Sequence, residues 1–292
     1  MISKAIWIGG ALVLVLGAVM ACSPLTVLNA VTPSATYDRA AGLAYGDHPR
    51  QRLDIYTPRD LKGPAPVVLF FYGGTWRTGE RGDYAFVGEA LASRGMVAVV
   101  ADYRLYPEVR YPAFLEDGAL ALAWTRERIA QYGGDPDALF LMGHSSGAYN
   151  AAMLALDKRL LAAVDLAPSL VRGWIGLAGP YDFLPIENPD VKPVFFHPDT
   201  PVDSQPINQV GPDAPPALLI AAEKDKLVDP RRNTGGLAEA LRGAGVMVEE
   251  VYDDGTNHMT LVGALSRPLR SLGPVLERVE AFVESDGGRR AP

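Results

Sequence analysis

Apolar runs separated by glycine and proline recur along most of the chain. Strand-like segments lie at 53–56, 66–72, 96–101, 138–143, 173–177, 217–222 and 246–252. The segment 53–56 alternates polar and apolar residues, which indicates a half-buried edge strand. Most of the others are continuous and rich in β-branched residues, which favours parallel strands covered on both faces.

Helical spacing of apolar residues occurs between these strand-like segments. The expected helices span 85–94, 112–132, 147–156, 232–244 and 268–283. Strands that alternate with helices imply right-handed crossovers and a mostly parallel sheet with helices on both faces. No repeat or long linker divides residues 37–285, so they are predicted to form one α/β domain, followed by a disordered tail at 286–292.

The segment Pro185–Pro216 interrupts this alternation. It contains nine prolines and shows little periodicity. A structureless insertion of this length inside a compact domain is typical of a lid or a binding loop. We therefore expect a lid-like insertion here.

The N-terminus has a different pattern from the rest of the chain. Lys4 is followed by an apolar run of about 17 residues, which fits a signal peptide over residues 1–21. The run is near the lower limit for spanning a bilayer, so an uncleaved anchor is the alternative. The sequence Val-Met-Ala-Cys that ends at Cys22 resembles a bacterial lipobox, in which the cysteine is lipidated.

That resemblance implies a location in the bacterial cell envelope. Ser23 after the cysteine is similar to the signal for outer-membrane delivery, so a lipoprotein facing the periplasm is expected; periplasmic or secreted protein is the alternative. Residues 22–36 lack charge and helical periodicity, and they are predicted to form a tether between the lipid and the domain.

Composition narrows the possible functions. The 292 residues are 48% hydrophobic and carry a formal charge of −7, which is typical of a globular protein and gives no electrostatic footprint for nucleic acid. One cysteine excludes an intramolecular disulfide and a cysteine-based zinc cluster. Since no phosphate loop, His-x-x-x-His pair or cofactor fingerprint occurs, neither metal nor cofactor is expected.

The sequence Gly-His-Ser-Ser-Gly at 143–147 carries the clearest chemical signal. It follows a predicted strand and opens a predicted helix, the context in which G-x-S-x-G forms a nucleophile elbow. The glycines remove side chains that would clash at such a sharp turn. Ser145 is therefore predicted to be a nucleophile.

A serine nucleophile needs a base within hydrogen-bond reach. His258 follows the last strand, where open α/β sheets place ligands, and is the predicted base. His144 lies inside the elbow and is expected to point away. His48 falls in a polar turn, and His197 in the proline-rich segment.

A carboxylate should orient the histidine. Asp225, just past a strand, is the favoured residue; Asp229 is its competitor and is otherwise expected to cap a helix or lie in a loop. The order Ser145, Asp225, His258 is that of α/β-hydrolases.

Together with Tyr-Gly-Gly-Thr-Trp at 72–76, these features resemble the esterase branch of the α/β-hydrolase superfamily. This branch includes hormone-sensitive-lipase-like carboxylesterases, feruloyl and acetylxylan esterases, and kynurenine formamidases. The similarity runs from about residue 45 to 283 and includes Asp-Tyr-Arg-Leu at 102–105, Gly-Gly-Asp-Pro at 133–136 and Ala-Pro-Pro-Ala at 214–217.

The resemblance implies an oxyanion hole made by the N–H groups of Gly74, Thr75 and Ser146. The chain departs from the pattern at Tyr72, where relatives usually carry a histidine that braces the loop. Two further predictions concern structure. Asp102, Arg104 and Asp117 are expected to form a buried ion pair. Five aromatic residues are expected either to line a substrate pocket or to pack in the core: Trp76, Tyr181, Phe183, Phe195 and Phe196.

The sequence thus predicts a serine carboxylic-ester hydrolase for short-chain or aromatic acyl esters. An arylformamidase or other amidase with the same triad is the alternative within enzymes, and a non-catalytic surface-binding module is the alternative outside them. Acyl specificity and oligomeric state are not determined by the sequence.

Overall fold

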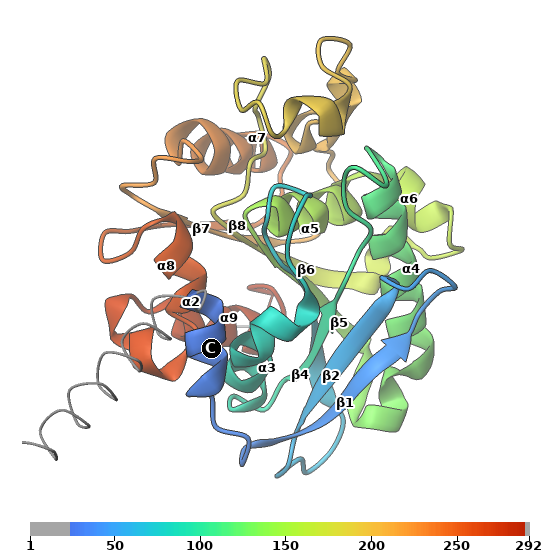
Figure 1. The fold of residues 1–292 in the computed structure, drawn as a ribbon, viewed down its shortest axis with the longest axis vertical. Coiled ribbons are helices and arrows are strands. Elements are labelled where there is room, and N and C mark those ends of the chain that lie inside the picture. Colours follow the sequence, from blue (N-terminus) through green and yellow to red (C-terminus); the bar gives the residue numbers. More distant parts are fainter. Residues whose placement is uncertain (1–23, 290–292) are drawn as a thin grey trace, which may run out of the picture.

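The computed structural model describes residues 24–289, which are organised around an eight-stranded sheet (Figure 1). The strand order is β1-β2-β4-β3-β5-β6-β7-β8; β2 is antiparallel to both neighbours, and the pairs from β4 to β8 are parallel. The strands are β1 (Tyr37–Ala44), β2 (Arg52–Pro58), β3 (Ala65–Phe71), β4 (Val97–Ala101), β5 (Gly134–His144), β6 (Val171–Leu177), β7 (Ala217–Ala222) and β8 (Val248–Asp253).

Helices cover both faces of this sheet, as predicted. They are α2 (Pro24–Ala30), α3 (Ala85–Ala92), α4 (Ala113–Arg128), α5 (Ser146–Leu156), α6 (Lys158–Ala162), α7 (Gly236–Gly243), α8 (His258–Gly263) and α9 (Val275–Glu284). Helices α3 and α9 pack together on one side, and α4, α5 and α6 on the other (Figure 1). Every residue of β4 and β7 is buried, because such strands have helices above and below.

Several boundaries differ from the sequence pattern. The segment 53–56 is not an edge strand, since β1 lies outside it; β1 contains Ala-Ala-Gly and no β-branched residue, so it gave no strand signal. The expected helix at 112–132 ends at Arg128 and continues as a 3-10 turn. The expected helix at 268–283 is a 3-10 turn (Arg267–Leu272) and α9, separated by Gly-Pro.

The segment predicted to be a tether contains a helix. Leu25 and Leu28 of α2 pack against the core. The Asn29 side chain donates to the carbonyl of Gly82 at 2.8 Å and accepts from the N–H of Phe86 at 3.2 Å. These tertiary contacts stabilise a helix that has no periodicity of its own, so the chain from Pro24 onward is part of the folded domain.

The predicted signal peptide (residues 1–21) and Cys22 lie outside the described residues. Within 24–289, none of the helices has the length and apolar character needed to cross a membrane. Of the predicted tail at 286–292, the structure describes residues 286–289, and among these Asp286 accepts a hydrogen bond from Arg172 at 2.8 Å.

The proline-rich segment is attached to the domain at several points. It contains 3-10 turns at Lys192–Phe195, Val202–Ser204 and Pro206–Gln209. The Tyr149 hydroxyl on α5 donates to the carbonyl of Ser204 at 2.7 Å, and the N–H of Phe183 donates to Gln205 at 2.8 Å. This segment therefore lies against the helix that follows Ser145.

Candidate active site

Ser145 lies in a strained turn between β5 and α5. Its φ and ψ angles are 54° and −124°, a conformation that non-glycine residues rarely adopt. A Cβ atom on Gly143 would lie 2.1 Å from the carbonyl oxygen of Gly147, and one on Gly147 would lie 2.0 Å from that of Phe71. Both glycines are therefore required by close backbone packing, as the elbow motif predicts.

The structure brings the three predicted triad residues together. His258 Nε2 lies 2.9 Å from Ser145 Oγ, and His258 Nδ1 lies 2.6 Å from Asp225 Oδ2. His258 does not lie in a loop: it is the first residue of α8, which Asn257 caps through the N–H groups of residues 259 and 260. The cap fixes the start of the helix and thereby the imidazole.

The Asp225 carboxylate is held by more than the histidine. Its Oδ1 accepts from the N–H groups of Leu227 and Val228 at 2.8 and 3.0 Å. Burial raises the pKa of Asp225, but the hydrogen bonds from His258 and the backbone together lower the pKa below its usual value. The group is ionised at neutral pH, and its charge places the imidazole hydrogen on Nδ1.

The competing carboxylate, Asp229, is elsewhere. It is exposed, and it accepts from the N–H groups of Arg231 and Arg232 at 2.9 and 3.0 Å, where a π-helical turn begins. Asp229 therefore lies in the loop just before Pro230, the N-cap of this turn, and its side chain binds the first two N–H groups of the turn.

His144 does not point away from the site. Its Nε2 donates to the carbonyl of His258 at 2.8 Å, and the two ring centroids are 5.1 Å apart. Burial and the nearby His258 lower the pKa of His144 to about 3, so its ring is neutral. The elbow and α8 meet at this point, so the hydrogen bond from His144 holds the backbone of His258 in place. His48 instead pairs with Glu108 at 2.7 Å.

The double-glycine loop, residues 72–79, lies against the nucleophile. A Cβ atom on Gly73 would come within 3.0 Å of Ser145 Cβ. Gly74 and Thr75 have φ angles of 133° and 53°. Within the described residues, the N–H groups of Gly74, Thr75 and Ser146 donate no hydrogen bond. They are available to an oxyanion formed at Ser145.

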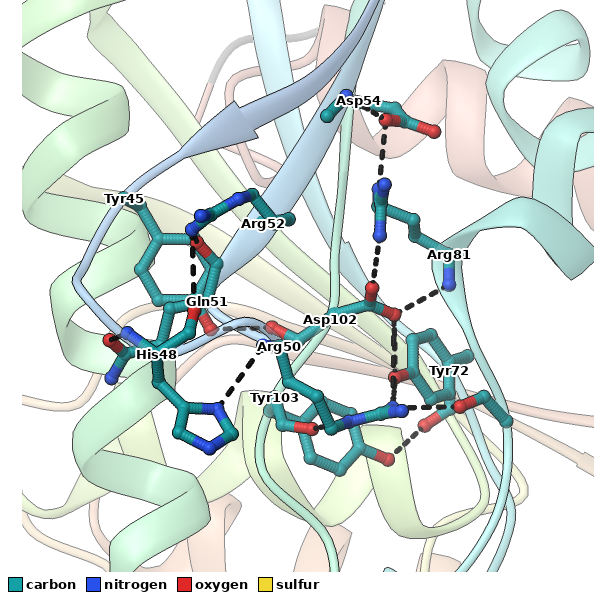
Figure 2. Close-up of polar contacts among 12 residues, drawn as sticks. Tyr45, His48, Arg50, Gln51, Arg52, Asp54, Tyr72, Arg81, Asp102 and Tyr103 are labelled. Carbon is teal, nitrogen blue, oxygen red and sulfur yellow. Dashed lines mark hydrogen bonds and ion pairs between the residues drawn. The ribbon is translucent and has the colours of Figure 1, made fainter.

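Tyr72 braces this loop through a polar network (Figure 2). Its hydroxyl donates to Asp102 Oδ1 and accepts from Arg50, both at 2.8 Å. Its ring stacks between Tyr84 and Tyr103, with centroids 5.4 and 4.9 Å away. Because Arg50 also donates to the carbonyl of Gly79, it joins the two ends of the loop. Arg50 was missed by the sequence analysis because no motif contains it.

Asp102, Arg104 and Asp117 were predicted to share one ion pair, but they belong to two separate ion pairs. Arg104 pairs with Asp117 at 2.8 Å, whereas Asp102 pairs with Arg81, whose N–H also donates to it at 2.6 Å. The correction follows from strand order: β3 lies beside β4, so the loop after β3 passes the end of β4 where Asp102 lies.

The aromatic residues predicted for a pocket have different environments. Trp76, Tyr181 and Phe195 are fully buried and pack in the core; Phe183 is partly buried, and Phe196 is exposed. Core packing thus accounts for three of the five.

Comparison with known proteins shows the family to which the chain belongs. The BD-FAE family model matches residues 53–241, from β2 to α7. The chain belongs to the BD-FAE family. The match stops before His258, so the predicted base lies outside the part on which the family assignment rests.

Curated relatives of this BD-FAE chain carry esterase names. It is 28% identical over 82% of its length to a probable isoprenylcysteine alpha-carbonyl methylesterase (ICMEL1) of Arabidopsis thaliana, covering 54% of that protein. It is 31% identical over 70% of its length to the probable carboxylic ester hydrolase LipM of Mycobacterium tuberculosis, covering 52%. The chain spans about half the length of these relatives.

Solved structures show the same α/β-hydrolase fold. A thermostable esterase from Pseudomonas putida is 25% identical, with a TM-score of 0.65 over 90% of this chain and 86% of the other. A truncated carbohydrate esterase from gut microbiota is 19% identical, with a TM-score of 0.73 over 88% and 99%, and shares the fold.

Proposed function

We propose that the protein is a serine carboxylic-ester hydrolase with Ser145 as nucleophile, His258 as general base and Asp225 as the orienting carboxylate. The observation that carries the proposal is the continuous hydrogen-bonded chain of Ser145, His258 and Asp225, at 2.9 and 2.6 Å. The names of the BD-FAE relatives support the same reaction class.

In the proposed reaction, Ser145 Oγ attacks the ester carbonyl while its proton passes to His258 Nε2. The imidazolium is stabilised by the Asp225 carboxylate. The N–H groups of Gly74, Thr75 and Ser146 hold the oxyanion. His258 then protonates the leaving alcohol, and water, activated by the same histidine, hydrolyses the acyl-enzyme.

Short-chain or aromatic acyl esters are the proposed substrates. The proposal rests on the resemblance of the elbow and the double-glycine loop to the branch that includes feruloyl and acetylxylan esterases. Hydrolysis of N-formylkynurenine, measured beside acetyl and feruloyl esters, separates an esterase from an arylformamidase.

The test is Ser145→Ala with a short-chain nitrophenyl ester. Loss of at least about 10³-fold in kcat is expected, because the members of a triad act as a unit. The melting temperature should change little. Labelling of the parent by a fluorophosphonate probe, absent in Ser145→Ala, checks the same residue; a folded parent that is not labelled would favour a binding module instead.

We also propose that Cys22 is lipidated and holds the domain at the bacterial outer membrane. The lipobox-like Val-Met-Ala-Cys supports this. Because α2 begins at Pro24, two residues after Cys22, the lipidated cysteine would lie at most about 7 Å from the start of the folded domain. Intact mass of membrane-extracted protein tests it, and an unmodified Cys22 would refute it.

A further inference from the structure

The backbone of the double-glycine loop is strained where it faces Ser145. Thr75 and Trp76 have φ angles of 53° and 58°, so two consecutive non-glycine residues adopt the left-handed conformation directly after Gly74. Such a conformation costs free energy and persists only where surrounding contacts hold it. The contacts that hold it therefore determine where the N–H groups of this loop point.

Most hydrogen bonds near Thr75 are internal to the loop. The carbonyl of Gly74 accepts from the N–H groups of Arg77 and Thr78 at 3.0 and 3.1 Å, and the Thr75 hydroxyl donates to the same carbonyl. The donor and the acceptor of each of these bonds both belong to the loop. These bonds fix its shape, whereas its position depends on bonds from outside the loop, such as the one that the N–H of Tyr106 donates to the carbonyl of Trp76 at 2.8 Å.

The Trp76 side chain connects the loop to the helix that begins beside Ser145. Its indole N–H donates to Asn150 Oδ1 on α5 at 2.9 Å, although the two residues are 74 positions apart. Both side chains are buried. Asn150 lies four residues, about one helical turn, after Ser146, whose N–H is the third proposed oxyanion donor. One rigid turn of helix thus joins this bond to that donor.

Asn150 makes no other side-chain hydrogen bond among the described residues. Its Nδ2 is buried without a partner. An apolar side chain here would remove this unpaired amide group, but it would leave the buried Trp76 indole N–H without an acceptor. The side-chain oxygen of Asn150 fixes the Trp76 indole, and with it the adjoining backbone of Thr75.

We propose that the Trp76–Asn150 hydrogen bond is a positioning contact that aligns the donors of the double-glycine loop with the donor at Ser146. This inference rests on the proposed function and adds two residues to it. Asn150 acts through Trp76 and does not touch the substrate.

The test compares Asn150→Leu with Asn150→Asp. The leucine variant loses the acceptor, and a fall in kcat of about 10- to 100-fold is expected with KM within about threefold, since removal of a whole oxyanion donor costs about 10²–10³-fold. Affinity for a boronic-acid transition-state analogue should fall in parallel. The aspartate variant keeps an acceptor oxygen in either protonation state and should retain kcat within about threefold.

Matched controls separate positioning from general loss of structure. Thr125→Val removes a buried hydroxyl from α4, far along the chain from the loop, and should leave kcat unchanged. Should Asn150→Leu fail to fold, Trp76→Phe removes the same bond, with Trp174→Phe on β6 as its control.

Two results would overturn the inference: an Asn150→Leu kcat equal to that of the parent, or an Asn150→Asp kcat as low as that of the leucine variant. Ser145→Ala assayed beside them keeps the two proposals distinct. If Ser145→Ala is inactive and Asn150→Leu is fully active, only the positioning role fails. If Ser145→Ala remains active, the proposed function itself fails.

Discussion

The nucleophile elbow at Ser145 and the double-glycine loop both hold non-glycine residues at positive φ, but different contacts hold them. At the elbow, Gly143 and Gly147 allow backbones to approach closely, and the strand and helix on either side complete the turn. The hydrogen bonds within the loop fix its shape but not its position. The loop is held by Tyr72 at one end and by Trp76 in its middle, each bonded to residues distant in the sequence.

Because of this difference, the nucleophile elbow and the double-glycine loop, the two halves of the site, should respond differently to substitution. The elbow depends on the absence of side chains at Gly143 and Gly147. The loop also needs its glycines, and in addition it depends on the side chains of Tyr72 and Trp76 and on their partners. Substitutions that break the Ser145–His258–Asp225 group should therefore abolish turnover, whereas those that loosen the loop should reduce it by degrees.

The largest expected effect comes from Asp225→Asn. Without the carboxylate the imidazole loses the charge that fixes its tautomer, and a loss of about 10³- to 10⁴-fold in kcat is expected. Asp229→Asn is the matched control, since an asparagine oxygen still accepts from the N–H groups of Arg231 and Arg232. Steady-state hydrolysis of a nitrophenyl ester measures both. Equal losses in the two variants would show that the assignment of the acid is wrong.

Tyr72→Phe weakens the other half of the site by a smaller amount. Removal of the hydroxyl leaves Arg50 and Asp102 each without one partner, so we expect a decrease of about 1–2 kcal/mol in the free energy of unfolding. A fall in kcat of about 3- to 10-fold should accompany it. Tyr84→Phe keeps the aromatic stack and serves as the control in denaturant melts and ester assays. A Tyr72→Phe enzyme with unchanged kcat would mean that Trp76 alone positions the loop.

The smallest effect on activity is expected at His144, which lies where the two halves meet. Since its pKa is about 3 when folded and about 6.5 when unfolded, the unfolded chain binds one more proton between these values. Stability therefore falls with acidification across this range, by about 1.4 kcal/mol per pH unit.

His144→Gln keeps a donor for the carbonyl of His258 but does not titrate. When the pH is lowered from 7 to 4.5, the parent should lose about 2–3 kcal/mol more of its free energy of unfolding than the variant does. Urea titrations at the two pH values measure this, and kcat at pH 7 should stay within a few-fold. Parallel pH profiles for parent and variant would contradict a neutral His144 in the folded state.

The sequence by itself determined the parts of this protein that follow from short-range rules. Continuous apolar runs predicted the buried strands, and the glycines around Ser145 predicted a sharp turn, because period and steric clash act between near neighbours in the chain. Strand-end positions identified Asp225 and His258, since parallel strands deliver their following residues to one edge of the sheet.

Only the tertiary structure decided which distant side chains meet. Arg81 rather than Arg104 pairs with Asp102, α2 docks where a tether was expected, and Asn150 accepts from Trp76. Each of these contacts joins residues tens of positions apart. Their geometry depends on strand order and on packing of the whole core, which no local pattern of hydrophobic and polar residues specifies.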